Sequence, residues 1–387
     1  MHTKKLLALV ICCLFFYNSY SQQNETVADV DVHSLSLYNA AQWKTLMIYG
    51  KEKISSGIDF PLLRMRTGYA AYMLGNFSES LTQYSKVFLD DKDNKLALYY
   101  VYLNNLYLNN EAATRFYAAQ LPAEMKVSEK IVKTKLSGLQ MEYSYKMPDD
   151  TARRNAQYAR VGFNFNLGYR FQLQQSIAYY TLMSNTAGMA NKPTYQRLQQ
   201  PEYYGKLIYA ANDKLSFIGA YHYISDHFPD TTFKTNIFLG GIKYSMPYFS
   251  IQANASVGNF AYNYTQYDGI VTFYPLGNLN LYSISRISFG SQTNFTQVLG
   301  AKLFKGVWAE GNLTTGKASY LFDNDALYVK NDPDPNLFRC GGSVYTVLSK
   351  KLLLSVNYTF EQKQKQFNIP VTNYFQNSIN GGLTWKF

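Results

Sequence analysis

The residues best suited to proton transfer after the first 21 positions are His33, His222 and His227. Ser225 and Asp226 stand beside His227, so one short stretch holds the three residue types of a nucleophile–base–orienter triad. Neighbours this close in sequence do not normally reach that geometry, because the three side chains must converge on one reacting atom. A solvated polar loop explains the stretch better, and we expect no catalytic residue and no enzymatic activity.

Metal-ligating patterns are weak in this chain. Beyond residue 21 it shows neither a histidine pair at helical spacing nor a cysteine pair. Asp323, Asp325, Asp332 and Asp334 fall in one predicted outer loop, residues 320–337, and could hold Ca²⁺. An ordinary solvated loop is the alternative that we favour, so we predict no metal and no other cofactor. The basic residues are dispersed and not clustered, which argues against a nucleic-acid partner.

From about residue 137 onward, apolar and polar residues alternate with a period of two. The clearest examples are residues 159–167, 249–257 and 352–361. Alternation of this kind places successive side chains on opposite faces of a β-strand. Tight turns alternate with longer loops (185–201, 226–235, 320–337 and 362–373). The pattern predicts an antiparallel up-and-down transmembrane β-barrel over residues 137–387, with about 14 strands and with about 12 or 16 as alternatives.

Alternation also assigns charged side chains to the inward face of this barrel. That face carries Glu142, Arg160, Lys206, Lys243, Asp268, Arg286, Lys302, Glu310 and Lys386, which is six basic groups against three acidic ones. His222 is expected to face inward too, because Tyr221 and Tyr223 take the lipid side. A basic excess in a low-dielectric lumen would concentrate an anionic solute. The alternative is a packed lumen whose charges pair with one another and conduct nothing.

The last fourteen residues, 374–387, form the clearest closing strand. Phe375, Ile379, Leu383, Trp385 and Phe387 alternate with polar residues or glycine. A final strand that ends on Phe resembles the C-terminal signature by which bacterial outer-membrane barrels are recognised for assembly. We therefore predict that Trp385 and Phe387 form an assembly signal, and that the barrel-assembly machinery and outer-membrane lipid are partners of the chain.

Composition and the N-terminal leader agree with a membrane barrel. The chain has 387 residues, a formal charge of +11, and 17% aromatic residues, including 36 Tyr and 25 Phe. Tyrosine suits a membrane–water interface, although a Tyr-rich soluble sandwich is an alternative. Residues 1–21 resemble a secretory signal peptide, with two lysines before an apolar run. Beyond them Cys340 is the one cysteine, so the fold must hold without an internal disulfide.

Between a predicted polar tether (22–30) and the barrel, residues 31–136 show helical periodicity and an internal repeat. Gly68, Gly75, Phe77 and Tyr84 match a repeat of about 34 residues, and Trp43 stands one period before Phe77. This spacing resembles the tetratricopeptide repeat, in which each helical hairpin buries its apolar face against its neighbours. We expect these five residues to pack the repeats. An α-helical bundle with an accidental period is the alternative.

The whole arrangement, a signal peptide, tetratricopeptide-like hairpins and a barrel that ends on Phe, resembles the YaiO-like outer-membrane proteins. The resemblance implies an outer-membrane barrel whose repeats lie in the periplasm and dock an unidentified periplasmic protein. Two functions follow as expectations. In the first, the barrel is a conduit for secretion or transport of a solute or polysaccharide. In the second, the barrel is a closed anchor, and the repeats scaffold a cell-envelope complex.

Overall fold

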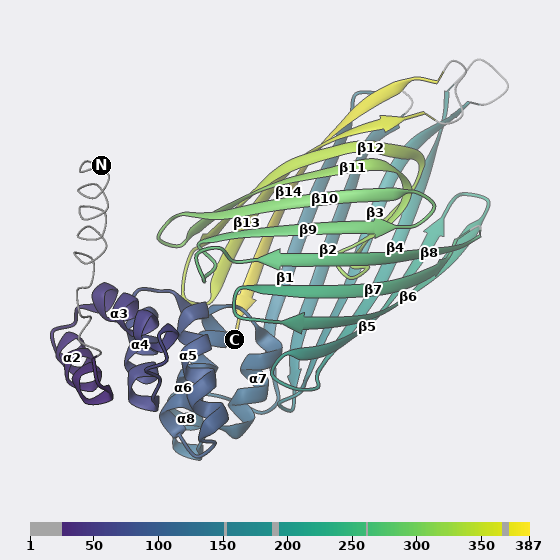
Figure 1. The fold of residues 1–387 in the computed structure, drawn as a ribbon. Coiled ribbons are helices and arrows are strands. Elements are labelled where there is room, and N and C mark those ends of the chain that lie inside the picture. Colours follow the sequence, from purple (N-terminus) through teal and green to yellow (C-terminus); the bar gives the residue numbers. More distant parts are fainter. Residues whose placement is uncertain (1–24, 151–152, 188–192, 261, 366–370) are drawn as a thin grey trace, which may run out of the picture.

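The computed structural model describes residues 25–150, 153–187, 193–260, 262–365 and 371–387. The predicted signal peptide lies outside these residues. A set of helices comes first, and the rest of the chain is one barrel of strands (Figure 1). The predicted tether is shorter than expected. Helix α2 already begins at Val27, because Thr26 and Asp29 form a capping box that satisfies the first backbone N–H groups.

Seven helices occur in the described part of the chain. They are α2 (Val27–Asn39), α3 (Trp43–Ser55), α4 (Pro61–Met73), α5 (Phe77–Asp90), α6 (Lys95–Tyr107), α7 (Glu111–Gln120) and α8 (Ala123–Ser128). Pro61 opens α4, and the Asn76 side chain caps α5. None of the helices in the described residues has the length and apolar character to cross a membrane.

The helices repeat with a fixed period. Helices α2, α4 and α6 begin at residues 27, 61 and 95, and helices α3, α5 and α7 begin at residues 43, 77 and 111, so each step is 34 residues. The turns repeat in the same register: Ala41, Gly75 and Asn109 all have left-handed φ angles, of 53°, 72° and 55°. Glycine adopts this conformation freely, whereas alanine is strained in it. The period seen in the sequence is therefore a period of the backbone.

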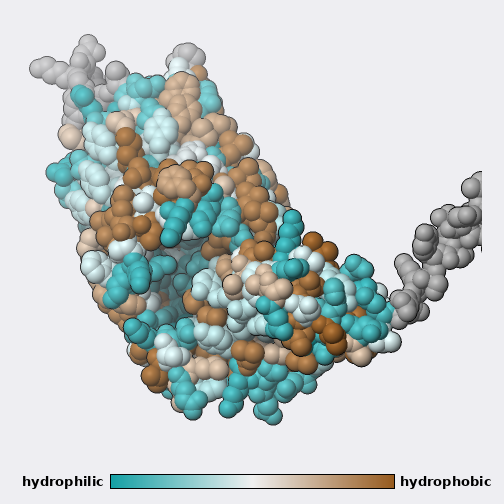
Figure 2. Space-filling model, turned by 90° about the vertical axis from the view of Figure 1, so that its left-hand side faces the viewer, coloured by the Kyte–Doolittle hydropathy of each residue, from teal (hydrophilic) through white to brown (hydrophobic). Residues whose placement is uncertain are grey.

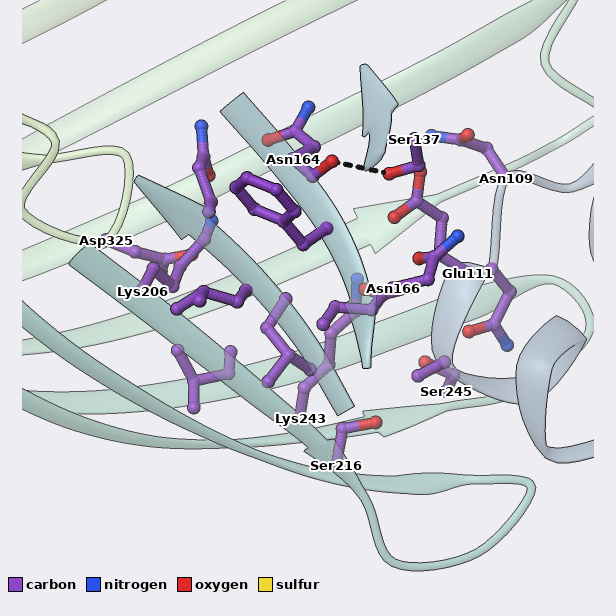
Figure 3. Close-up of a pocket in the computed structure, with 18 of the residues that line it drawn as sticks. Asn109, Glu111, Ser137, Asn164, Asn166, Lys206, Ser216, Lys243, Ser245 and Asp325 are labelled. Carbon is purple, nitrogen blue, oxygen red and sulfur yellow. Dashed lines mark hydrogen bonds and ion pairs between the residues drawn. The ribbon is translucent and has the colours of Figure 1, made fainter. Parts of the chain in front are cut away.

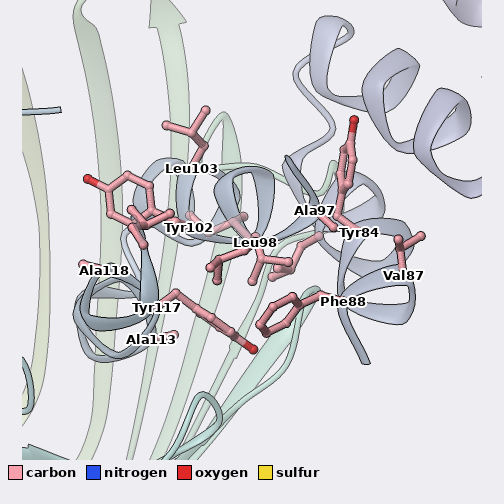
Figure 4. Close-up of a cluster of buried hydrophobic side chains, with 14 residues drawn as sticks. Tyr84, Val87, Phe88, Ala97, Leu98, Tyr102, Leu103, Ala113, Tyr117 and Ala118 are labelled. Carbon is pink, nitrogen blue, oxygen red and sulfur yellow. The ribbon is translucent and has the colours of Figure 1, made fainter. Parts of the chain in front are cut away.

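The predicted repeat-packing residues lie between helices. A Cβ atom on Gly68 would stand 2.9 Å from the Tyr84 ring, so glycine is what lets α4 and α5 approach each other. Tyr84 is 1% exposed and belongs to the main helical core (Figure 4). Trp43 packs edge-to-face on Tyr69, and Phe77 stacks on Tyr107. Aromatic contacts of this kind join successive hairpins.

Fourteen strands follow the helices. The first seven are β1 (Lys135–Pro148), β2 (Arg153–Leu167), β3 (Phe171–Ala187), β4 (Pro193–Ala210), β5 (Leu215–His227), β6 (Thr232–Ser245) and β7 (Phe249–Asn259). The others are β8 (Asn263–Phe273), β9 (Leu281–Phe289), β10 (Thr293–Phe304), β11 (Val307–Asp323), β12 (Tyr328–Val347), β13 (Leu352–Gln364) and β14 (Asn373–Lys386). Each strand pairs antiparallel with its sequence neighbours, and β1 pairs with β14 to close the barrel. The predicted fold class and strand number are confirmed.

The closing pair confirms the alternation of the final strand. Ile379, Leu383 and Trp385 are 51%, 42% and 47% exposed on the outside, whereas Gln376 and Ser378 are 8% exposed. Residues of β14 pair with a strand on each side. Trp385, for example, lies opposite Leu139 of β1 and opposite Leu352 of β13.

The outer face of the barrel is apolar over most of its strands. Its exposed side chains include Met141, Ile177, Phe238, Ile251, Leu299, Val344, Val356 and Ile379, each between 45% and 62% exposed. Figure 2 shows such hydrophobic side chains on one flank of the barrel. Water-soluble monomers do not carry apolar surface on this scale, whereas a hydrocarbon layer covers it.

The helices lie against one end of the barrel, at the short turns between strands (Figure 1). The Ser78 backbone N–H donates to the carbonyl of Gly277 at 2.9 Å, and the Asn278 side chain donates to the carbonyl of Gly75 at 2.8 Å. The α7 residue Arg115 donates to the carbonyl of Gly168. We call this end of the barrel the helix side.

Candidate functional site

The lumen holds part of its own wall. Pairing between β10 and β11 ends at Phe295 with Thr315, and pairing between β12 and β13 begins at Asn336 with Lys363. Beyond these points β11 and β12 pair only with each other and form a two-stranded ribbon, residues 316–335, which we call the inner hairpin. Figure 1 shows its turn inside the barrel.

The prediction of an outer loop at 320–337 is therefore wrong. The hairpin bends inward at Gly316, whose φ is 114° and whose Cβ, if present, would lie 2.5 Å from the carbonyl oxygen of Thr293. Phe322 and Leu327 are 0% and 5% exposed, since they pack against apolar residues of β4, β5, β6 and β8, and Leu321 is 3% exposed. Burial of this apolar surface is one reason for the inward course.

The tip of the inner hairpin is conformationally costly. Asn324, Asp325 and Ala326 all have left-handed φ angles, of 49°, 57° and 63°. Each left-handed residue other than glycine costs about 1–2 kcal/mol, and alanine lacks the local hydrogen bonds that ease this cost for Asn and Asp. Strain of this kind persists only where the surroundings hold it in place.

Polar contacts with the wall supply that restraint at the tip. Asp325 Oδ1 accepts hydrogen bonds from Gln252 (2.7 Å) and Asn254 (3.1 Å), both on β7. Its Oδ2 accepts one from Lys206 Nζ of β4 at 3.2 Å. The Tyr204 hydroxyl donates to the Asp325 carbonyl at 3.0 Å. All of these donors belong to the barrel wall.

The carboxylates of the hairpin are paired along its whole length. Asp323 binds Arg286 of β9 and Arg339 of β12, the latter at 2.7 Å. Three further ion pairs follow toward the opposite end: Lys330 with Glu361 (2.6 Å), Asp332 with Lys363 (2.5 Å) and Asp334 with Arg153 (2.8 Å). The favoured interpretation of these four aspartates as solvated loop residues is wrong. Neither do they form a metal centre, because the described residues contain no cluster of metal-ligating side chains.

His222 lies inward as predicted, and it contacts the hairpin. It is 1% exposed, and its Nδ1 lies 2.7 Å from the carbonyl oxygen of Ala326. A carbonyl oxygen can only accept, so Nδ1 carries the proton. Nε2 lies 3.2 Å from Glu202.

The triad residue types are not assembled. Ser225 lies 3.1 Å from His227 Nε2, but the other ring nitrogen of His227 contacts Thr232 and not Asp226. Asp226 instead accepts from Asn331 of the hairpin at 3.4 Å.

Some of the other predicted lumen residues form polar contacts with one another or with tyrosines, and the rest are lysines that line a cavity or are exposed. Glu142 pairs with Arg160 at 2.8 Å, and Asp268 pairs with Arg286 at 2.9 Å, both inside the lumen. Glu310 accepts from the hydroxyls of Tyr282 and Tyr345. Lys243 lines a cavity, whereas Lys302 and Lys386 are exposed at the helix side; Lys302 lies 5.3 Å above the Trp308 ring. Sequence reasoning missed Glu202, Glu361 and Lys363 as lumen residues, and it placed the four hairpin aspartates in an outer loop.

Three cavities lie along the inner hairpin. The helix-side cavity, of about 360 Å³, is lined by Glu111 from α7 and by Lys206, Lys243 and Asp325 (Figure 3). A second, of about 240 Å³, lies beside the hairpin between Glu142 and Lys363. The third, of about 420 Å³, lies toward the end opposite the helices and has more apolar walls, including Phe228 and Phe233. The hairpin contributes residues to all three.

Comparison with known proteins gives only remote structural similarities. No protein-family model and no curated protein sequence matches the chain. Among solved structures, the Acinetobacter baumannii outer membrane protein Omp33 aligns over 65% of this chain and 99% of its own, at 9% identity and a TM-score of 0.39. The toluene transporter TbuX of Ralstonia pickettii aligns over 65% of this chain and 90% of its own, at 9% identity and a TM-score of 0.43. The toluene transporter TodX of P. putida aligns over 71% of this chain and 92% of its own, at 8% identity and a TM-score of 0.42.

The fold and the lumen define the chain as a 14-strand outer-membrane β-barrel preceded by a helical region. The inner hairpin is its distinguishing internal feature. The YaiO-like resemblance stays a prediction.

Proposed function

We propose that this protein is a gated conduit of the outer membrane, in which the inner hairpin closes the lumen and its withdrawal opens a path for a solute or polymer. The observation that carries the proposal is the hairpin itself, seated among cavities on the helix side and on the opposite side. A barrel that served only as an anchor could fill its lumen with wall side chains. Here that space is occupied by a ribbon whose strand pairing with the wall ends at its base.

The contacts that seat the hairpin are of a reversible kind. Ion pairs and hydrogen bonds join it to the wall, and water can replace each of them when the hairpin moves out. The apolar part of the contact centres on Phe322, Ala326 and Leu327. The strained tip favours release. The seated and withdrawn states can thus differ little in free energy, as a gate requires.

The helical region is proposed to be the docking module of the conduit. Its 34-residue period and the packing of Gly68 against Tyr84 support a tetratricopeptide-like solenoid. Both ends of the barrel's chain lie on the helix side, which faces the periplasm in single-chain outer-membrane barrels. We propose that the helices recruit a periplasmic protein to this mouth.

Excision of the hairpin tests the conduit. Tyr320 pairs with Asn331, so residues 321–330 can be replaced by the turn Asn-Gly without changing the register of the ribbon. We expect the wild-type protein to conduct rarely in a planar bilayer and the excised variant to conduct persistently. The matched control replaces residues 228–231 by the same turn, because His227 pairs with Thr232 at an ordinary barrel hairpin. The control should behave as wild type.

The second candidate is a closed anchor whose helices scaffold an envelope complex. The observation that favours it is the position of the helices over the turns on one side of the lumen. Under this reading the excised variant stays silent although it is folded and inserted. That result would contradict the conduit and move the function to the helices.

A further inference from the structure

We propose that Lys206, Gln252 and Asn254 form a carboxylate-binding site in the lumen wall, which Asp325 occupies when the hairpin is seated. A small carboxylate that enters from the helix-side cavity takes the place of Asp325 and releases the hairpin. The inference rests on the proposed function only in that release of the hairpin opens the conduit.

The geometry around Asp325 is that of a complete site. Both carboxylate oxygens are bound: Oδ1 by Gln252 and Asn254 at 2.7 and 3.1 Å, and Oδ2 by Lys206 at 3.2 Å. One donor is charged and two are neutral amides, a set that binds an ionised carboxylate strongly. The side chains of Lys206 and Asp325 are only 14% and 12% exposed. Water therefore competes weakly for these donors.

The donors come from the wall and stay in place when the hairpin leaves. Lys206 projects from β4, and Gln252 and Asn254 project from β7, which lies three strands away in the barrel order. Withdrawal of Asp325 removes the acceptor shared by three partly buried donors, of which Gln252 keeps a 3.1 Å hydrogen bond to Asn254 Oδ1. An unsatisfied buried donor is costly, so the vacated site favours a carboxylate, whose two oxygens can accept from both strands.

The charge around the site favours a carboxylate over a cation. Lys206, Lys243, Asp325 and Glu111 all line the helix-side cavity. Lys243 forms no ion pair with any of the described residues, so its charge is not neutralised by direct contact. When Asp325 withdraws, two lysines face one carboxylate, and the cavity becomes net positive.

Wall side chains beside the site also donate hydrogen bonds to the hairpin. Tyr204, His222 and Gln266 donate to backbone carbonyls of the hairpin at 3.0, 2.7 and 2.8 Å. The wall thus offers donors where the hairpin offers oxygen atoms. Gln266 Oε1 also accepts from the Phe322 N–H at 3.0 Å, but most of these wall groups are donors and suit a ligand with oxygen acceptors.

Cysteine accessibility at the tip measures release. Ala326 is 2% exposed in the seated hairpin, so a cysteine placed there reacts with a maleimide only when the hairpin withdraws. The variant Ala326→Cys is made together with Cys340→Ser in the full chain, reconstituted in lipid vesicles. We expect sodium acetate to accelerate labelling with a saturable dependence on concentration. Equal acceleration by sodium chloride at the same ionic strength would show screening alone and overturn the site.

Asp325→Gly in the same background removes the carboxylate that acetate is proposed to displace. Glycine accepts the 57° φ angle of this position, so the fold is not put at risk. Loss of the bound carboxylate should accelerate labelling by about tenfold or more without any ligand. Acetate should then no longer accelerate labelling, because there is no bound carboxylate for it to displace. Acceleration by acetate in this variant would contradict the assignment.

A wall variant separates the site from the conduit. Lys206→Gln should abolish the dependence on acetate, while Lys305→Gln, at an exposed turn, should retain it. Acetate-driven labelling without any bilayer current would support the site and contradict the conduit. Current through the hairpin-excised variant without an acetate effect on labelling would support the conduit and contradict the site.

Discussion

Tyr117 on α7 donates a 2.8 Å hydrogen bond to Asp213 in the turn between β4 and β5. The contact joins residues that are 96 positions apart in sequence and belong to the two parts of the molecule. Tyr117 is 7% exposed. Burial raises the pKa of its hydroxyl, and the neighbouring carboxylate of Asp213 raises it further. One of the contacts that attach the helices to the barrel is therefore a hydrogen bond whose donor, the Tyr117 hydroxyl, keeps its proton in the folded state.

The first prediction concerns this proton. Because the folded-state pKa of Tyr117 lies above its unfolded value of about 10, the stability from this group is present below about pH 10 and is lost as the pH rises further. We expect the helices to detach and become protease-sensitive at alkaline pH. Tyr117→Phe should weaken attachment by about 1.5–3 kcal/mol at neutral pH and reduce the alkaline loss. Tyr107→Phe, at a 44% exposed position, is the control. An unchanged alkaline response in Tyr117→Phe would exclude this role.

The second prediction concerns the helical core. Tyr84 stacks on Tyr100 with ring centroids 4.5 Å apart and lies against Gly68. Tyr84→Ala should cost about 3–5 kcal/mol, because it leaves a cavity between α4 and α5. The helical circular dichroism signal should melt early, while the barrel still migrates as a compact species on unboiled gels. Leu89→Ala, at a position 63% exposed, should change neither. Joint loss of both signals would mean that the helices and the barrel share one cooperative core.

The sequence predicts the barrel well because strand alternation is a local property. A period of two defines each strand, and the number of such segments defines the closed sheet. The helical period is equally local, since Gly68, Gly75 and Phe77 mark one hairpin by themselves. Contacts between the helices and the barrel, such as Tyr117 with Asp213, have no local signature.

The inner hairpin was not predictable from its own composition. Asp323, Asp325, Asp332 and Asp334 are typical of a solvated loop, and only their partners on distant strands make burial favourable. Two signals were nevertheless present. Phe322 is a large apolar residue within a supposedly exposed loop, and the predicted lumen had three more basic groups than acidic ones. The hairpin carboxylates neutralise part of that excess.

The third prediction concerns the latch at Arg286. Its side chain is 9% exposed and binds both Asp268 and Asp323. Arg286→Gln leaves Asp268 without a cation and Asp323 with Arg339 alone, and removal of one partner from a buried pair costs about 3–5 kcal/mol. We expect a higher open probability in single-channel recordings, partly reversed by adding Asp323→Asn. Lys305→Gln is the control. A closed Arg286→Gln protein would show that this pair does not hold the gate.

The fourth prediction concerns ion selectivity after hairpin excision. Lys206 loses its carboxylate partner Asp325, and Arg286 and Arg339 lose Asp323, when residues 321–330 are replaced. The open lumen should therefore prefer anions, more strongly at low salt, because the screening length falls from about 30 Å at 0.01 M to about 3 Å at 1 M. The reversal potential under a salt gradient measures this. A cation-selective pore would contradict the charge assignment of the lumen.

The last prediction concerns the closing strand. Trp385 pairs on one side with Leu139 and on the other with Leu352, and the Phe387 N–H donates to the carbonyl of Ser137 at 3.2 Å. Deletion of residues 385–387 removes these backbone pairs together with the two aromatic side chains. Export across the inner membrane should continue, but the heat-modifiable barrel species should disappear from the outer-membrane fraction.

A second variant separates the loss of the aromatic side chains from the loss of the backbone pairs. Replacement of Trp385 and Phe387 by alanine keeps every backbone pair, so the barrel can still close. If the aromatic side chains are an assembly signal, the double alanine variant should accumulate unassembled in the periplasm, as the deletion does. Normal barrel levels in the alanine variant with loss in the deletion would assign the role to strand pairing alone. The contrast decides whether the terminal Phe is read by the assembly machinery or simply completes the sheet, because the alanine variant lacks the aromatic side chains but keeps the backbone of the last three residues.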